Sequence, residues 1–289
     1  MQDFTNKIAV VTGGGTGMGR ALVTQLAAAG CHVATCDLAE DNLALTRAAA
    51  AEAGPDVRVT AHRADVADEE ALVRFRDEVL EQHDTDHIHL LFNNAGIGGG
   101  GSMFTATRES WERTFNVCWG GVYLGARVFL PLLAAADEGH IVNTSSVNGF
   151  WASLGPDRPH TAYSAAKFAV KGFTEALITD LRINAPHVKA SVVMPGHIGT
   201  SIVENSMRFG GMNLADMTDE DRRLAEEMAA VFEASAPVTA DQAAEVILQG
   251  VRDERWRILI GDDAHALDEA VRANPEGAYD GLSLGELTN

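Results

Sequence analysis

The sequence predicts an α/β fold, a doubly wound parallel sheet of seven strands covered by helices on both faces. Short β-branched runs alternate with longer helical runs along the 289 residues. This alternation is typical of strand–helix–strand units, in which each helix returns the chain to start the next parallel strand. No stretch rich in proline, glycine and serine divides the chain, so we expect a single domain over residues 1–289.

The expected strands follow the apolar runs in order. They are KIAVVTGG, HVATCDL, VRVTAHRADV, HLLFNNAG, HIVNTSSV, VKASVVMPG and RWRILIG. The expected helices cover Gly17–Ala29, Glu40–Ala53, Asp68–Gln82, Glu109 to about Ala136, and roughly Thr161–Asn184. Two segments interrupt the alternation: the proline-containing loop Trp151–His160, and a long helical insertion, Ser201–Ala236, before the last helix and strand.

The insertion is rich in methionine. It contains Met207, Met212, Met217 and Met228, half of the eight methionines in the chain. Methionine adapts to irregular apolar surfaces, so these residues either fill ordinary core space or form a mobile apolar lid over a substrate. We predict a helical substrate lid over residues 201–236.

Composition excludes several classes of function. The net charge of −19 repels phosphate backbones, so we expect no nucleic-acid partner. No apolar run approaches the roughly 20 residues of a membrane span, and the N-terminal MQDFTNKIAVV lacks the pattern of a signal peptide. We therefore expect no membrane partner and a cytoplasmic location. Residues 262–289 form an acidic C-terminal extension with seven acidic side chains and one arginine, expected to be a solvated polar tail.

Cysteine and histidine usage predicts neither a disulfide nor a metal site. Cys31 and Cys36 bracket one expected strand, and their odd spacing directs them to opposite faces of it. A His-x-His pattern occurs in HDTDHIHLL, but no carboxylate or cysteine set accompanies it. The third cysteine, Cys118, lies in an expected helix, and unpaired cysteines fit a reducing compartment.

A glycine-rich turn follows the first strand. Gly13, Gly17 and Gly19 come directly after a buried strand and open a helix. Such glycines allow a tight turn and a close approach of backbone N–H groups to a pyrophosphate, which the helix N-terminus attracts. The pattern is either a dinucleotide cradle or only a tight strand-to-helix turn.

Asp37 favours the cradle. It ends the second strand, 18 residues after Gly19. A carboxylate there can accept hydrogen bonds from both ribose hydroxyls of an adenosine and would repel a 2′-phosphate. The neighbouring Leu38, Ala39 and Thr16 are not basic. We therefore expect NAD(H) to be preferred over NADP(H). The alternative is that Asp37 is a simple turn residue.

The chain resembles the short-chain dehydrogenase/reductase family, whose domain is a Rossmann fold, over about Lys7–Ile260. Seven motifs carry the resemblance in the family's order. They are TGGGTGMG (Thr12–Gly19), ADV (Ala64–Val66), NNAG (Asn93–Gly96), FNV (Phe115–Val117), NTSS (Asn143–Ser146), YSAAK (Tyr163–Lys167) and PGHIGT (Pro195–Thr200). The resemblance implies a cofactor cleft along the carboxyl ends of the strands.

The resemblance implies cofactor contacts at three further places. In the family, Asp65 hydrogen-bonds the adenine amino group and Val66 flanks the adenine ring. The turn Asn93–Gly96 stabilises the central sheet and passes along the cofactor ribose, and Pro195, Ile198 and Thr200 contact the nicotinamide end. The implied cofactor-binding residues are Gly13, Thr16, Gly17, Met18, Gly19, Asp37, Leu38, Asp65, Val66, Asn93, Ala95, Gly96, Tyr163, Lys167, Pro195, Gly196, Ile198 and Thr200.

Tyr163 and Lys167 are candidates for the chemistry. At positions i and i+4 of a helix they share one face. A free tyrosine has a pKa near 10, and a nearby ammonium favours the phenolate, which makes tyrosine a workable general acid and base. Alone, a tyrosine and a lysine at this spacing are usually exposed surface residues without a function. Here the pair follows the cofactor motifs, which favours a catalytic role.

Ser146 and Asn116 complete the predicted catalytic set. Ser146 ends a strand, where its hydroxyl can polarise a substrate carbonyl; Ser145 is the rival, and the family pattern selects the second serine. The spacing from Ser146 to Tyr163 is about four residues longer than is usual in the family, which leaves Ser146 less secure. Asn116 is implied to hold a water that relays protons to Lys167, with a buried structural asparagine as the alternative.

These residues predict an NAD-dependent oxidoreductase that interconverts a secondary alcohol and a ketone. The apolar candidates for the substrate pocket, Phe150, Trp151, Met207, Phe209 and Met212, favour a bulky hydrophobic substrate. The alternatives are a 3-oxoacyl-thioester reductase, a non-redox epimerase that retains NAD, and a cofactor-binding regulator without chemistry. The resemblance further implies a homotetramer or homodimer.

Overall fold

The architecture is a three-layer sandwich with the parallel sheet in the middle. The computed structural model describes residues 1–155, 158–210 and 218–280. The sheet contains β1 (Ile8–Thr12), β2 (His32–Asp37), β3 (Val59–Arg63), β4 (Leu90–Asn93), β5 (Gly139–Thr144), β6 (Val188–Pro195) and β9 (Arg257–Ile260). Their order is β3-β2-β1-β4-β5-β6-β9, and every neighbouring pair is parallel. The predicted seven-stranded, doubly wound fold is confirmed.

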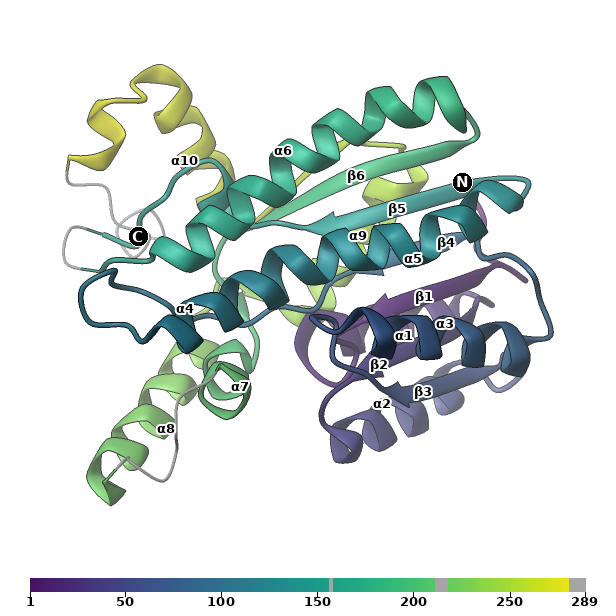
Figure 1. Cartoon of the computed structure of the whole chain (residues 1–289), viewed down its shortest axis with the longest axis horizontal. Helices are drawn as coiled ribbons and strands as arrows, with labels where there is room; N and C mark the ends of the chain where they lie inside the picture. The colour runs from purple at the N-terminus through teal and green to yellow at the C-terminus, as the bar shows by residue number, and fades with distance from the viewer. Residues whose placement is uncertain (156–157, 211–217, 281–289) are drawn as a thin grey trace.

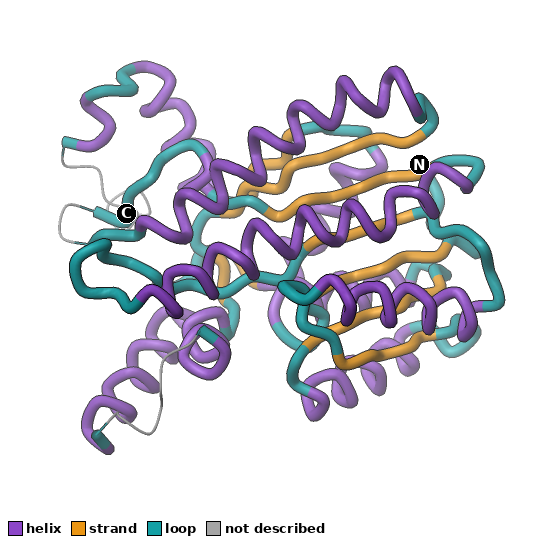
Figure 2. The backbone as a smooth tube through the Cα atoms, in the orientation of Figure 1, coloured by secondary structure: helices purple, strands orange, loops and turns teal. Residues whose placement is uncertain are grey.

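Helices cover both faces of this sheet. They are α1 (Gly17–Ala28), α2 (Glu40–Ala53), α3 (Glu69–His83), α4 (Arg108–Phe115), α5 (Gly121–Ala135), α6 (Thr161–Asn184), α7 (Ile202–Phe209), α8 (Asp219–Ala234), α9 (Ala240–Arg252) and α10 (Asp262–Ala273). Figure 1 shows α3, α5 and α6 on the near face of the sheet. Figure 2, in the same view, shows the strands running side by side behind these helices.

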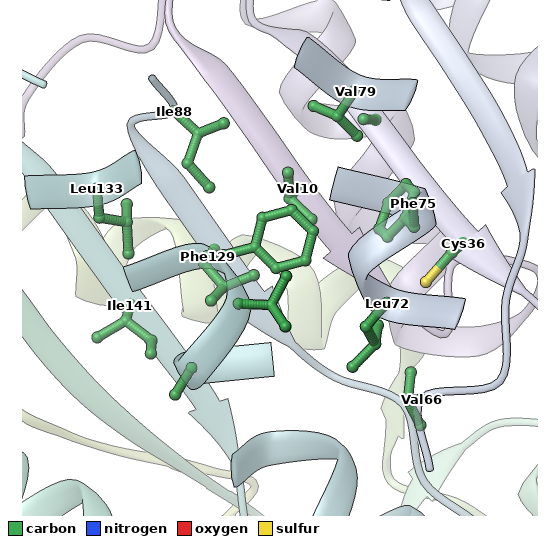
Figure 3. Packing of buried hydrophobic residues seen from close by; sticks show 14 of the residues in the cluster. Val10, Cys36, Val66, Leu72, Phe75, Val79, Ile88, Phe129, Leu133 and Ile141 are labelled. Carbon is green, nitrogen blue, oxygen red and sulfur yellow. The ribbon is translucent and has the colours of Figure 1, made fainter. Parts of the chain in front are cut away.

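Two apolar cores form, one on each face of the sheet, because alternate side chains of a strand point to opposite faces. Figure 3 shows part of the near core, where Phe75 of α3 lies against Phe129 of α5 over strand residues such as Val10. These two rings meet edge to face, with centroids 5.6 Å apart. Cys36 lies in this core and Cys31 in the opposite one, so the prediction that they occupy different faces is confirmed.

The long helix expected over Glu109–Ala136 is interrupted. A π-helical turn, η1 (Asn116–Gly120), lies between α4 and α5. The combined stretch Arg108–Ala135 is long and apolar enough to cross a membrane by length and composition, and half of its most apolar window is buried inside the protein. Burial of this kind is expected of a core helix, but the finding corrects the expectation that no apolar run reaches such a length.

The chain reverses its winding between β1 and β4, which is where open α/β sheets form their ligand crevice. Figure 1 shows that α7, α8 and α10 all lie beyond the carboxyl ends of the strands. A small second sheet, in which β7 (Ile198–Gly199) pairs with β8 (Val238–Thr239), joins the two ends of the helical insertion. Strands of two residues carry too little pattern to be predicted.

The beginning of the C-terminal extension packs on the protein and is not a solvated tail. Leu267 of α10 and Ala278 of the 3₁₀ turn η4 (Gly277–Tyr279) are buried in a small apolar cluster. Trp151 lies in the same cluster and donates its indole N–H to the Ala278 carbonyl at 2.7 Å. Two acidic residues of this segment also face inward: Asp263 is buried, and Asp268 pairs with Arg257.

Candidate functional site

A cavity of about 1200 Å³ opens at the carboxyl ends of the strands. One part of its wall comes from the glycine turn and from the ends of β2, β4, β5 and β6; another comes from α6, α7 and α8. Among the residues predicted to bind the cofactor, the lining includes Gly13, Thr16, Gly17, Met18, Asp37, Leu38, Asp65, Val66, Ala95, Gly96, Tyr163, Lys167, Pro195, Gly196, Ile198 and Thr200. The structure thus brings together motifs that are far apart in the sequence.

The glycine turn is shaped to admit a backbone-bound ligand. Gly13 has a φ of +68°, and a Cβ built on it would lie only 2.7 Å from the Cα of Ala95. Gly19 lies beneath the turn, where a Cβ would collide with the Gly13 carbonyl. The Thr12 hydroxyl accepts from the backbone N–H groups of Asn94 and Ala95, which holds the two loops together. These contacts keep the turn compact, and its residues Gly13, Thr16 and Gly17 line the cavity, which fits the pyrophosphate of a dinucleotide.

Asp37 stands at the edge of this turn with its carboxylate toward the cavity. Its two oxygens accept from the backbone N–H groups of Gly15 and Ala39, at 3.0 and 3.1 Å. The nearby Arg20 points away, because its guanidinium donates to the Gly15 carbonyl and to the Thr46 hydroxyl. The cavity wall beside Asp37 therefore presents a carboxylate and no cation from Arg20.

Asn93 is not in the cavity wall. Its amide is buried under the sheet and donates to Asn143 at 2.8 Å, which in turn donates to Thr174 of α6. The next residue, Asn94, lines the cavity instead and donates to the carbonyls of Thr12 and Gly13. Asn93 thus stabilises the central sheet as expected, while Asn94 takes the place in the cavity wall that was expected for Asn93, because alternate residues at the end of a strand face opposite ways.

Asp65 has a partner that sequence reasoning missed. Arg113 of α4 approaches it with Nη1 2.7 Å from Oδ2, and its Nε donates to the carbonyl of Phe209 at the end of α7. One guanidinium thus connects the expected adenine position with α7, the first helix of the segment predicted to be a lid. No sequence signal marks Arg113, since it is one of several charged residues in an exposed-looking helix.

Tyr163, Lys167 and Ser146 lie together where the cavity reaches α6. The Lys167 Nζ lies 5.3 Å from the centroid of the Tyr163 ring and donates to the Thr144 carbonyl at 2.8 Å. Burial raises the pKa of Tyr163, while a hydrogen bond with the Ser146 hydroxyl lowers it. Burial also lowers the pKa of Lys167. Both groups are therefore less easily charged than they are in water.

The two candidate serines are placed differently. Ser145 donates its hydroxyl to the Lys167 carbonyl at 2.7 Å and so fastens β5 to α6. Ser146 Oγ accepts from the backbone N–H of Asn148 at 3.1 Å and keeps its proton for another partner. Only the Ser146 hydroxyl is engaged with Tyr163. The geometry favours Ser146 as the residue that contacts a substrate oxygen, in spite of the longer loop that follows it.

Asn116 does not reach this cluster. It is exposed at the start of the π turn, and the structure does not place it in the cavity wall. Cys118 takes the inward position: it is fully buried, and its Sγ lies 3.1 Å from the Ile97 carbonyl. A Cβ built on Gly96 would lie within 4 Å of both the Cys118 Sγ and the Lys167 Nζ, so these groups are neighbours.

The substrate pocket differs from the prediction on one side. Met207 and Phe209 line the cavity as expected, whereas Met212 falls outside the described residues. Phe150 and Trp151 do not line it, because they pack toward α10 in the apolar cluster described above. In their place the loop before α6 contributes Leu154, Gly155, Arg158 and His160.

The comparisons with known proteins agree with this geometry. The family model of short chain dehydrogenases matches residues 7–209, and the chain belongs to this family. A Mycobacterium tuberculosis protein named "Putative oxidoreductase SadH" is 36% identical over 94% of this chain and 92% of its own.

A levodione reductase of Leifsonia aquatica is 33% identical over 71% of this chain and 74% of its own. A crystal structure of a short chain dehydrogenase/reductase from Burkholderia phymatum in complex with NAD has a TM-score of 0.83 and 30% identity. The superposition covers 96% of this chain and 95% of the Burkholderia phymatum chain. The protein is thus an oxidoreductase of this family, whose members typically use NAD or NADP.

Proposed function

We propose that the protein interconverts a secondary alcohol and a ketone with NAD(H), on a bulky apolar substrate. One observation carries the proposal. Tyr163, Lys167 and Ser146 lie together in the wall of a single cavity, and the same wall contains the glycine turn and Asp37. A bound nicotinamide dinucleotide would supply the hydride acceptor or donor, and in its oxidised form a positive charge near the phenol.

The chain's own residues move and hold the proton. The Tyr163 Oη takes the hydroxyl proton of an alcohol, or gives a proton to the oxygen of a ketone. The Ser146 hydroxyl donates to the same substrate oxygen and polarises its bond to carbon. Lys167 stabilises the phenolate by its charge, since an ammonium within a few ångströms lowers the pKa of a neighbouring acid.

The apolar face of α8 supports a hydrophobic substrate. Leu224, Met228 and Val231 occur at helical spacing, all line the cavity, and all are more than half exposed. When an apolar ligand covers exposed apolar groups on a cavity wall, the burial of this surface favours binding. The face therefore fits a substrate whose carbon skeleton lies against the lid.

The first test is Tyr163→Phe. We expect turnover of alcohols with NAD⁺ to fall by a factor of about 10² to 10⁴, because the proton has no acceptor. Binding of NADH, followed by its fluorescence, should remain. Turnover near that of the wild type would refute the assignment of Tyr163. The control is Tyr123→Phe, since Tyr123 is an exposed tyrosine on α5.

The second test concerns the preference for NAD(H). Asp37→Ala should lower kcat/KM for NAD⁺ about tenfold or more, since hydrogen bonds to a charged group are lost. The ratio of kcat/KM for NAD⁺ to that for NADP⁺ should fall at the same time, because the repulsion of a 2′-phosphate is removed. Asp41→Ala, on the exposed first turn of α2, is the matched control. A wild-type protein that prefers NADP⁺ would overturn the preference.

A further inference from the structure

One polar side chain in the substrate end of the cavity is unused by the chemistry proposed above. His160 lines the cavity and is the residue immediately before α6. Its imidazole lies against the Tyr163 ring, with centroids 4.6 Å apart and planes inclined by 31°. Among the described residues, no hydrogen bond involves its ring nitrogens. The imidazole is thus held beside the phenol with its hydrogen-bonding capacity free.

The other histidine in the cavity wall shows the contrast. The Nε2 of His197 lies 2.8 Å from the carbonyl of Phe232, and its ring packs on the Phe232 ring with centroids 4.3 Å apart. Its backbone N–H donates to Asp263. His197 is therefore a structural residue that holds α8, whereas no residue in the described part of the chain is a comparable partner for the His160 ring nitrogens.

His160 and Lys167 lie on opposite sides of Tyr163 along the chain. Lys167 lies one turn after Tyr163 and is fixed to the end of β5 through the Thr144 carbonyl. His160 lies three residues before Tyr163 and lines the cavity, as do Leu154 and Gly155 of the preceding loop. A substrate whose reacting oxygen is bound by Tyr163 and Ser146 would therefore extend toward the imidazole.

The protonation state of His160 fits a neutral ligand. Burial lowers its pKa to about 4, so the imidazole is uncharged at neutral pH. A neutral imidazole has one N–H donor and one acceptor nitrogen. It can donate to a ketone oxygen or accept from a hydroxyl group, and so it serves both the oxidised and the reduced form of a substrate.

We propose that His160 recognises a second oxygen of the substrate, on the carbon next to the reacting one. The ring centroids of His160 and Tyr163 lie 4.6 Å apart, a separation at which two oxygens bound one to each ring can sit on adjacent carbons of the substrate. The substrate class is then a vicinal diol, an α-hydroxyketone or a 1,2-diketone with an apolar remainder. This inference rests on the proposed alcohol–ketone chemistry and narrows it.

The test compares two ketones that differ in this second oxygen. The probes are 1-phenylpropane-1,2-dione and 1-phenylpropan-2-one, reduced with NADH by the wild type, by His160→Phe and by His160→Gln. Phe keeps the ring that packs on Tyr163, and Gln keeps a donor and an acceptor. For the dione we expect kcat/KM to fall about tenfold or more in His160→Phe. For the monoketone we expect a change within about twofold, because no hydrogen bond is lost.

His160→Gln should recover most of the activity on the dione. Equal losses on both ketones in His160→Phe would overturn the proposal, since His160 would then only support Tyr163. An unchanged dione activity, or a wild type that reduces only the monoketone, would overturn it as well. A wild type that reduces neither ketone would instead contradict the proposed function itself. Binding of NADH, measured by fluorescence, checks that each variant is folded.

Discussion

We expect the acidity of Tyr163 to depend on Lys167, whose Nζ lies 5.3 Å from the centroid of the Tyr163 ring. Alcohol oxidation requires the phenolate, so its rate should rise with pH through the pKa of Tyr163 and then level off. Lys167→Met removes the neighbouring positive charge, and the midpoint of this profile should move to higher pH by about one unit or more. The measurement is kcat against pH with saturating alcohol and NAD⁺.

Lys171→Met is the matched control for this shift. Lys171 lies one turn further along α6 and pairs with Glu175 at 2.8 Å, away from the cavity. Its loss should leave the midpoint where it is in the wild type. If Lys167→Met kept the same midpoint as the wild type, the charge of Lys167 would not be what tunes Tyr163.

At this scale the sequence predicts well the residues whose chemistry comes with a fixed spacing. Tyr163 and Lys167 share a helix face because they are four residues apart, and Asp37 ends a strand that the hydrophobic pattern reveals. Trp151 illustrates the opposite case. A large apolar residue after Ser146 suits a substrate pocket, but its burial depends on α10 and η4, more than a hundred residues away in the chain.

The π turn η1 is an element that the hydrophobic periodicity of the sequence cannot predict. An extra residue in a helical turn changes which side chains face inward, so the 3.6-residue repeat used before it no longer holds after it. Asn116 is consequently exposed and Cys118 is buried beside the Ile97 carbonyl. Such turns are frequent at functional sites, and here the turn adjoins Lys167.

This placement yields a paired prediction. Asn116→Ala should leave kcat within about twofold of the wild type, while Cys118→Ala should lower it about fivefold through loss of one supporting hydrogen bond. Cys31→Ala, a buried thiol in the core on the other face of the sheet, should lower stability without this loss of kcat. The readouts are initial rates and thermal unfolding. A large loss of kcat in Asn116→Ala would reverse the assignment of the inward position.

For the whole molecule, the parallel sheet explains why the site could be anticipated. Parallel strands deliver all their carboxyl ends to one edge, so motifs at strand ends must meet there whatever their separation in the chain. The cofactor side of the cavity follows from that rule. The lid, the loop before α6 and the C-terminal helix do not, because their positions are fixed by tertiary contacts between irregular segments.

Arg113 connects these two parts of the molecule. Through Asp65 it contacts the sheet edge where the adenine is expected, and through the Phe209 carbonyl it contacts the lid helix α7. Removing it should loosen both, so the KM values for cofactor and substrate should rise together while kcat changes little. The Arg113 side chain is 24% exposed, and solvent screening limits such a pair to about 1 kcal/mol, or roughly fivefold in KM.

The variants Arg113→Met and Arg113→Lys test this connection. Lys keeps the charge for Asp65 but lacks the planar fork that reaches a second acceptor, so it should restore the KM for cofactor more than the KM for substrate. Arg108→Met is the control, since Arg108 pairs with Glu112 on the exposed face of the same helix, at 2.7 Å. Steady-state kinetics with each reactant varied in turn separates the two KM values. A rise in only one of them in Arg113→Met would show that Arg113 serves a single site and does not couple the lid to the cofactor.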